Sequence, residues 1–163
     1  AVRTLPGRLC ALEAPDAAAL AGLQEVAAAL GLRAFEMPSE QKARYHAALS
    51  AASNFSVALA AYAQNLLQPL ALPEALSREL VVNLMRQSVD NVAAMPPAAA
   101  LTGPIVRGDD GTVAAHLAAL SAAEREAYGA WARQTLVLAA ARLDEGVYAR
   151  VEKVLACGEV AQD

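Results

Sequence analysis

One segment of the sequence, KARYHAALSAASN, carries side chains that could transfer protons and hold a polar substrate. Lys42, His46, Ser50 or Ser53, and Asn54 follow one another at steps of three or four residues, so they share one face of a helix. An ammonium and an imidazolium one turn apart repel each other, which favours a neutral form of one of them. Lys42 or His46 could then act as a general acid or base near neutral pH, while Asn54 orients a carbonyl or hydroxyl. The alternative is structural: the two cations lie on a solvated first turn, and Ser53 and Asn54 form hydrogen bonds inside a helix bundle.

A second segment, LTGPIVRGDDGT (101–112), has the glycine and proline content of a shaped loop. Arg107 is its one cation and precedes a predicted helix start, a position that suits a carboxylate or phosphate ligand. Asp109 or Asp110 can cap the helix that follows. The alternative is that Arg107 and Asp109 pair with each other or with neighbouring residues and only fix the turn.

His116 is expected one turn into the helix after this loop, close to Arg107 and Asp109. Near a helix N-terminus the charged form of a histidine is disfavoured. The alternative is that His116 is a structural hydrogen-bonding residue. Four aromatic residues are interpreted as core or groove residues without a chemical role: Tyr45, Tyr62, Tyr128 and Trp131.

The first elements read as strand, helix and strand. Residues 8–14 form a short apolar run, Asp16 offers a helix start, Gly31 a helix stop, and residues 33–37 a second strand that ends at Pro38. Two strands joined through a helix are normally parallel, and parallel sheets are covered on both faces. Two strands cannot make such a sheet, so we expect the remaining strands to come from residues before Ala1 or from another chain.

The rest of the chain is predicted to be helical. The first of these helices would be roughly 40 Å long at 1.5 Å per residue, and Ser39 could cap it. Ser121 and Glu124 match a capping box. Because alanine is abundant throughout, the helices should approach closely in a tight bundle. The expected helices cover 39–67, 73–95, 112–120, 121–143 and 145–156.

Composition excludes several classes of protein. The 163 residues are 56% hydrophobic and 18% charged, which is typical of a folded domain and not of a disordered chain. A net charge of −4 without a basic patch argues against nucleic acid and against a peripheral membrane role. The run from Tyr45 to Pro73 carries no charge, but its serines, asparagines and glutamines argue against a membrane span. Two distant cysteines and two distant histidines predict neither disulfides nor a metal site, and favour a cytoplasmic protein.

The two segments together, KARYHAALSAASNF and ALTGPIVRGDDGTVAAHLAAL, carry a family resemblance. They are similar to the C-terminal domain of unknown function that follows a Rossmann-like domain in bacterial NAD(P)-binding oxidoreductases. That family resembles pyrroline-5-carboxylate reductase and, more distantly, the 6-phosphogluconate dehydrogenase group. The resemblance covers residues 7–143. It is sharpest at Tyr45, His46, Ser53, Asn54, Thr102, Gly103, Pro104, Arg107, Gly108, Asp109 and His116.

The resemblance implies a mainly α fold with two parts. Residues 1–38 would be the β-α-β end of a Rossmann-like domain, and residues 39–163 a 6-phosphogluconate dehydrogenase C-terminal-like helical bundle around one long helix. It also implies a homodimer in which the helical domains pack together. No glycine-rich dinucleotide-binding motif occurs in the chain, so NAD or NADP would be bound mainly by a preceding domain, and this chain alone would be inactive.

The activity implied is that of an NAD(P)-dependent oxidoreductase acting on a small polar substrate. Lys42 or His46 would transfer a proton and Asn54 would position the substrate. Lys42 and Asn54 lack the four-residue spacing of the hydroxyacid dehydrogenases, so the choice between Lys42 and His46 stays open. The alternative is a helical dimerisation or ligand-binding module without catalytic function. The residues expected to bind substrate or cofactor are Ser53, Thr102, Arg107, Asp109 and His116.

Overall fold

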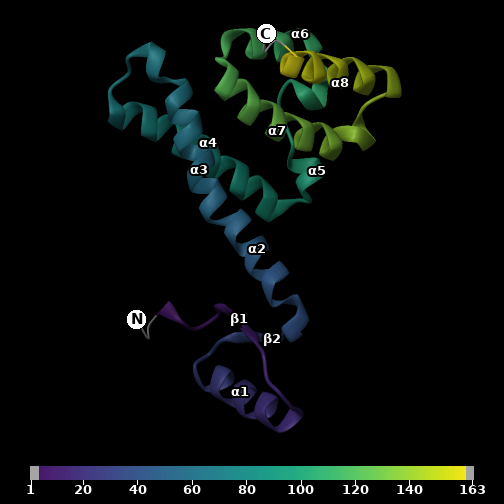
Figure 1. The fold of residues 1–163 in the computed structure, drawn as a ribbon. Helices are drawn as coiled ribbons and strands as arrows, with labels where there is room; N and C mark the ends of the chain where they lie inside the picture. Colours follow the sequence, from purple (N-terminus) through teal and green to yellow (C-terminus); the bar gives the residue numbers. More distant parts are fainter. Residues whose placement is uncertain (1–3, 161–163) are drawn as a thin grey trace. The chain divides into compact units, whose positions relative to one another are not determined.

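The computed structural model describes residues 4–160, with side chains as far as residue 157. It is mainly helical, with a short two-stranded sheet near the N-terminus (Figure 1). The chain divides into two compact units, an N-terminal unit up to Arg78 and a C-terminal unit from Glu79 onward. The division predicted at residue 38 separates the end of a Rossmann-like domain from a helical domain. It stays a prediction.

The N-terminal unit begins with the predicted strand, helix and strand. They are β1 (Leu9–Leu12), α1 (Ala17–Ala29) and β2 (Arg33–Glu36), and the two strands are parallel, with Leu9 opposite Arg33. The Asp16 carboxylate accepts a hydrogen bond from the Ala19 amide (2.8 Å) and caps α1, and Gly31 follows the helix with a φ of +69°. The signals at both ends of this helix are therefore confirmed.

The predicted long helix is wrong in one respect, because it is divided at Ser53. The segment forms a 3-10 turn η2 (Ser39–Gln41), then α2 (Lys42–Ala52) and α3 (Asn54–Leu66). The Ser53 hydroxyl donates to the Leu49 carbonyl (2.7 Å), and the Ser56 hydroxyl donates to the Ala52 carbonyl (2.9 Å). Serine side chains that bond back to the preceding turn in this way bend helices. After α3 the chain continues through the short turn η3 (Gln68–Leu70).

Helix α4 (Glu74–Ala94) begins directly after Pro73, as predicted, and continues from the first unit into the second. The C-terminal unit then contains two short elements that the sequence pattern did not predict, α5 (Pro97–Ala100) and η4 (Ile105–Arg107). The remaining elements are α6 (Asp110–Ala119), α7 (Ala122–Ala139), η5 (Ala140–Arg142) and α8 (Glu145–Val160). Ser121 and Glu124 form the predicted capping box at the start of α7.

The core of the C-terminal unit lies among η4, α6, α7 and α8, which pack side by side (Figure 1). The largest fully buried side chains of this core are Val113 in α6, Leu136 in α7, and Val151 and Leu155 in α8. The short element α5 is held by Arg142, whose Nη1 atom donates to the carbonyls of Ala98 (3.0 Å) and Leu101 (2.9 Å). None of the helices within the described residues combines the length and apolar character that a bilayer crossing needs.

Candidate functional site

A polar cluster lies where both parallel strands end. Glu13 directly follows β1, while Ser39 and Lys42 follow β2, and the carboxyl ends of parallel strands meet at one edge of a sheet. The Lys42 Nζ atom lies 2.7 Å from the Glu13 carboxylate, and the lysine side chain is 65% exposed. Hydrogen bonds from Lys42 and, to a smaller extent, from Ser39 lower the pKa of Glu13 below its usual value. Ser39 therefore binds Glu13, and its predicted role as a helix cap is wrong.

The other residues of the first predicted segment lie further along α2 and α3. His46 and Asn54 are exposed, and no hydrogen bond or ion pair within the described part of the chain joins either of them to Lys42. Ser53 is exposed and donates to the carbonyl of Leu49 in the preceding turn, so its hydrogen bond is structural but does not lie inside a helix bundle. Tyr45 packs edge-on against Phe35 of β2, with ring centroids 6.0 Å apart, and so connects α2 to the sheet. Residue spacing does not reveal Glu13, because only strand pairing brings it beside Lys42.

The second predicted segment is a loop fixed to the helical core. Ile105 and Val106 are buried, so the middle of the loop is part of the hydrophobic core. Gly108 follows with a φ of +66°, and a Cβ atom at this position would lie 2.0 Å from Cγ1 of Val147 in α8. A glycine is therefore needed here both for the backbone conformation and for the close approach of α8.

Asp109 caps α6, as predicted. Its carboxylate accepts hydrogen bonds from the Thr112 amide (3.0 Å) and from the Thr112 hydroxyl (2.7 Å). These bonds lower the pKa of Asp109, with smaller contributions from the charges of Arg107 and His116, which lie near it. Asp110, the alternative cap, instead lies 3.7 Å from the guanidinium of Arg150.

Arg107 is exposed, and within the described residues its side chain forms no ion pair with Asp109. The two residues therefore do not pair with each other, but the bonds between Asp109 and Thr112 agree with the other form of the structural alternative, in which a neighbour fixes the turn. Thr102 is also exposed, two residues before the buried part of the loop. Both side chains are accessible to a ligand.

His116 forms a pair with Tyr128, to which the sequence pattern assigned no chemical role. Its Nδ1 atom lies 2.8 Å from the Tyr128 hydroxyl, and the two rings meet edge to face at 84°. Burial raises the pKa of Tyr128 above its usual value. The expected position of His116 near the helix N-terminus is wrong, because α6 begins at Asp110 and places His116 in its last turn.

The C-terminal unit thus gathers a guanidinium, a carboxylate, an imidazole and a phenol. Arg107 could hold an anionic group, and the hydrogen-bonded pair of His116 and Tyr128 could exchange a proton. Asp109 orders the loop that carries Arg107. The first predicted segment lies in the N-terminal unit and the second in the C-terminal unit.

Both segments fall within a known protein family. Residues 8–135 match the family described as a domain of unknown function, DUF2520. The chain belongs to the DUF2520 family. A crystal structure of protein TM1727 from Thermotoga maritima is also similar, with a TM-score of 0.59 and 29% sequence identity over 91% of this chain. The match covers 53% of TM1727, so this chain spans about half the length of that protein. No curated protein matches the chain.

Proposed function

We propose that this DUF2520 chain is the helical substrate-binding and dimerisation part of an NAD(P)-dependent oxidoreductase that acts on a small polar substrate. The observation that carries the proposal is the cluster of Glu13, Ser39 and Lys42 at the carboxyl ends of two parallel strands. In open sheets with helical crossovers, ligands bind at that edge.

The exposure of the strands supports a larger sheet. All four residues of β2 are exposed, Leu9 in β1 is 69% exposed, and Phe35 in β2 is 41% exposed. Parallel strands are normally buried on both faces, so these apolar side chains need additional strands and helices to cover them. We propose that residues 1–38 are the end of a Rossmann-like domain whose remaining strands supply that cover.

In this proposal the nicotinamide cofactor supplies or accepts a hydride, and the chain supplies orientation and a proton. The Lys42 ammonium and the Ser39 hydroxyl are donors suited to phosphate or ribose oxygens, and the Glu13 carboxylate is an acceptor suited to a ribose hydroxyl. Lys42 or His46 would transfer the proton, and Asn54, with Ser53 beside it, would position the substrate. In the C-terminal unit, Arg107 would bind an anionic group with Thr102 near it, while Asp109 and His116 shape the loop.

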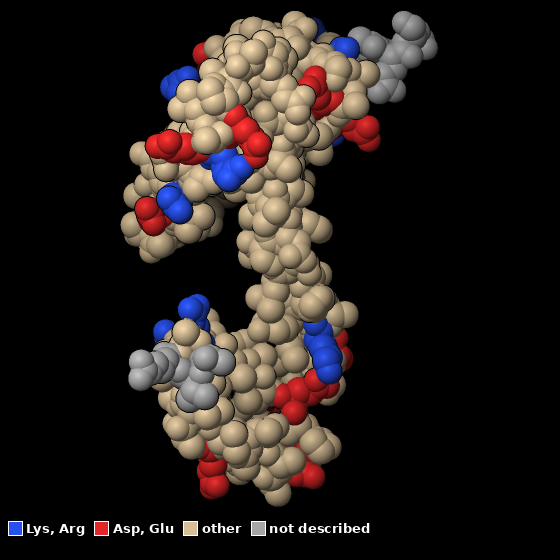
Figure 2. Space-filling model, turned by 90° about the vertical axis from the view of Figure 1, so that its left-hand side faces the viewer, with Lys and Arg blue, Asp and Glu red and all other residues tan. Residues whose placement is uncertain are grey.

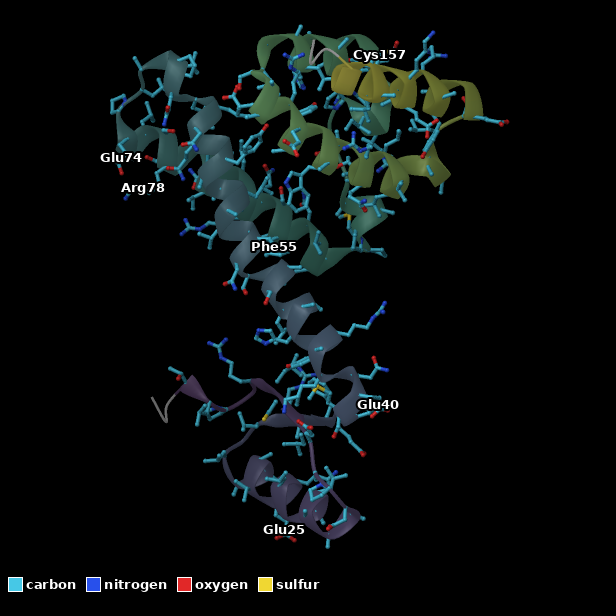
Figure 3. All side chains as sticks on the ribbon, viewed as in Figure 1. Glu25, Glu40, Phe55, Glu74, Arg78 and Cys157 are labelled. Carbon is cyan, nitrogen blue, oxygen red and sulfur yellow. The ribbon has the colours of Figure 1, made fainter. Side chains whose placement is uncertain are left out.

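Homodimer formation is supported by apolar side chains on α3 and α4. On α3, Phe55, which is labelled in Figure 3, is 54% exposed and Val57 is 70% exposed. Helix α4 exposes Leu84, Val89 and Val92. Residues 45–66, which form the rest of α2 after Arg44 and all of α3, contain no Asp, Glu, Lys or Arg, and Figure 2 shows a stretch of surface without charged side chains. Exposed apolar surface of this kind marks association sites. The same feature favours the second candidate, a dimerisation module without catalytic function.

The cofactor experiment uses the protein at the full length that its gene encodes. NADH and NADPH are titrated into it, and nicotinamide fluorescence reports binding. We expect saturable binding that Lys42→Gln weakens. The control is Arg44→Gln, which removes an exposed cation on the same helix and should leave binding unchanged.

Sedimentation velocity on the same protein distinguishes the two candidates. A folded dimer that binds neither cofactor would contradict the oxidoreductase and support the module. A monomer that binds NADPH would contradict the dimerisation part of the proposal only. Substituting Val57→Glu should shift a dimer toward monomer if α3 lies in the interface.

A further inference from the structure

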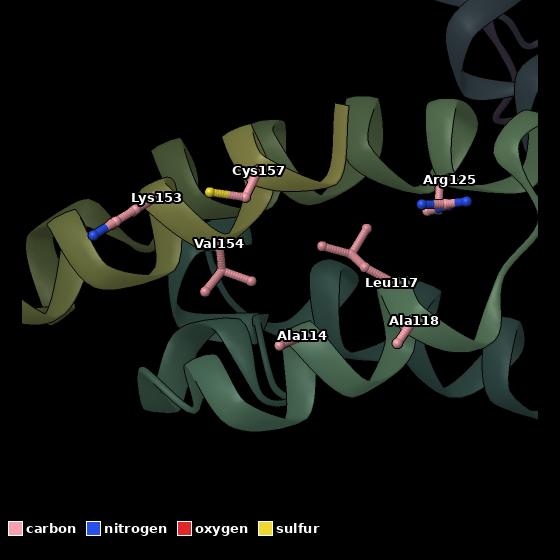
Figure 4. A pocket seen from close by; sticks show the side chains of 7 residues that line it. All are labelled: Ala114, Leu117, Ala118, Arg125, Lys153, Val154 and Cys157. Atoms are coloured by element: carbon pink, nitrogen blue, oxygen red, sulfur yellow. The ribbon is translucent and has the colours of Figure 1, made fainter. Parts of the chain in front are cut away.

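A second binding site is indicated by a hollow in the C-terminal unit between α6 and α8 (Figure 4). Its volume is about 350 Å³. In Figure 4, Leu117 and Val154 point toward one another from the two helices, with Arg125 at one end and Lys153 at the other. The residues that line it are Ala114, Leu117, Ala118, Arg125, Lys153, Val154 and Cys157. None of them belongs to the cluster of Arg107, Asp109, His116 and Tyr128.

The floor of the hollow is apolar and has room for a short chain. Ala114 and Ala118 leave space beside Leu117, because their side chains end at a single carbon. Pockets that bind small molecules have volumes of about 300–1,000 Å³, a mainly apolar lining and a few polar groups. The hollow lies at the small end of this range, which suits an aliphatic ligand rather than a nucleotide.

The charges at the hollow select an anion. Two of the lining residues are cationic and none is acidic, although the whole chain has a net charge of −4. Arg125 is half-buried, and its Nε atom is shielded from solvent without a hydrogen-bond partner among the described residues. A guanidinium in such a partly apolar setting pairs strongly with a carboxylate, which its two terminal nitrogens can bind together.

We propose that this hollow binds a small amphiphilic carboxylate. The carboxylate would pair with the terminal nitrogens of Arg125, and the aliphatic chain would lie over Leu117 and Val154. Lys153 adds positive potential at the other end without contacting the head group. This site goes beyond the proposed oxidoreductase function and does not depend on it.

The binding test uses octanoate as the probe and Cys157 as the reporter. Cys157 lines the hollow and is exposed, whereas Cys10, the other cysteine, is half-buried in the N-terminal unit. Iodoacetamide labels both thiols, and peptide mass spectrometry follows each rate separately. We expect octanoate to slow the labelling of Cys157 saturably and to leave Cys10 unchanged. Octanol, which has the same chain without the charge, should bind at least about tenfold more weakly, equivalent to about 1.4 kcal/mol.

Two pairs of variants separate the charge from the shape of the hollow. Arg125→Gln should raise the dissociation constant of octanoate about tenfold, and Lys153→Gln should change it by less than about threefold. Ala118→Phe should fill the hollow and abolish protection of Cys157. Its control is Ala119→Phe, which changes an exposed neighbour on α6 that does not line the hollow.

Three results would overturn the proposal. The first is equal binding of octanol and octanoate together with no effect of Arg125→Gln. The second is equal protection of Cys10 and Cys157, which would indicate a change in the whole protein. The third concerns the Ala118→Phe variant: it binds octanoate as the wild type does, but its oligomeric mass is altered. That result would identify the hollow as a contact between protein chains. Circular dichroism of each variant establishes that it is folded before it is compared.

Discussion

Replacing Gly108 by alanine tests how the arginine loop is held on the helical core. The residue has a left-handed backbone, with a φ of +66°, and ends the η4 turn. A Cβ atom built there lies 2.0 Å from Val147 Cγ1 and 3.5 Å from Val147 Cβ. The first of these distances is far inside van der Waals contact, so either the loop or α8 has to move.

The cost of Gly108→Ala has two parts. A left-handed alanine costs about 1–2 kcal/mol, and overpacking a filled core costs about 1–3 kcal/mol. The free energy of unfolding should therefore fall by about 2–5 kcal/mol. Gly103→Ala is the matched control: its φ is +102°, but no atom lies within 4 Å of a Cβ added there. That variant should lose only the conformational part, about 1–3 kcal/mol.

Urea unfolding followed by tryptophan fluorescence measures both variants. The chain has a single tryptophan, Trp131, and it lies in α7, so the signal reports the C-terminal unit. Val147→Ala removes Cγ1 and leaves ordinary contacts, 3.5 Å to the Cβ atom of residue 147 and 3.7 Å to Leu143 Cδ2, so it should relieve the clash in the double variant. We expect a coupling free energy of about 1–3 kcal/mol between the two substitutions. If the effects of Gly108→Ala and Val147→Ala add without coupling, the clash is not the cause and the reasoning is refuted.

Three further predictions concern single residues. The folded-state pKa of Asp109 is lowered mainly by its bonds to Thr112, so its charge stabilises the fold above the unfolded-state pKa, and this stabilisation is lost as the pH falls through the folded-state pKa. Asp109→Asn should remove that part of the loss of stability at acid pH. If the free energy of unfolding of this variant falls with decreasing pH as steeply as that of the wild type, Asp109 is not the group responsible. Tyr128→Phe removes the hydrogen bond to His116 and should lower the free energy of unfolding by about 0.5–1.5 kcal/mol. An ultraviolet titration should also lose the tyrosine whose pKa is raised. A titration curve identical to that of the wild type would contradict the raised pKa of Tyr128. Ala71 has a left-handed backbone with a φ of 50°, so Ala71→Gly should stabilise the fold by about 1 kcal/mol in thermal unfolding, whereas no gain would mean that the turn relaxes without strain.

The sequence predicted the elements whose ends carry local signals. Asp16 and Gly31 set the limits of α1, and Ser121 with Glu124 set the start of α7, because these residues act on backbone groups within their own turn. The break at Ser53 was missed, because a serine can also be accommodated inside a straight helix. Here its hydroxyl donates to a carbonyl of the preceding turn, and this bond bends the helix. The turn η4 was missed because burial of Ile105 and Val106 depends on helices that come later in the chain.

In the candidate sites too, contacts within one turn could be predicted from the sequence, and contacts between distant elements could not. The role of Asp109 as a helix cap was predictable, because its partner Thr112 is one turn away. The partners of Lys42 and His116 were not, because Glu13 and Tyr128 belong to other elements and come close only through strand pairing and helix packing. Sequence spacing therefore selected residues with suitable chemistry but could not identify what each one contacts.

These contacts also bear on the choice between Lys42 and His46 within the proposed function. The Lys42 ammonium already pairs with Glu13 at the sheet edge, and a group paired in this way serves better to bind and orient oxygen atoms than to exchange protons. His46 lies one turn further along α2, is exposed, and forms no hydrogen bond or ion pair within the described residues. An imidazole without a partner can reach a substrate, and its two ring nitrogens can accept and donate a proton. The geometry of the N-terminal unit therefore favours binding by Lys42 and proton transfer by His46.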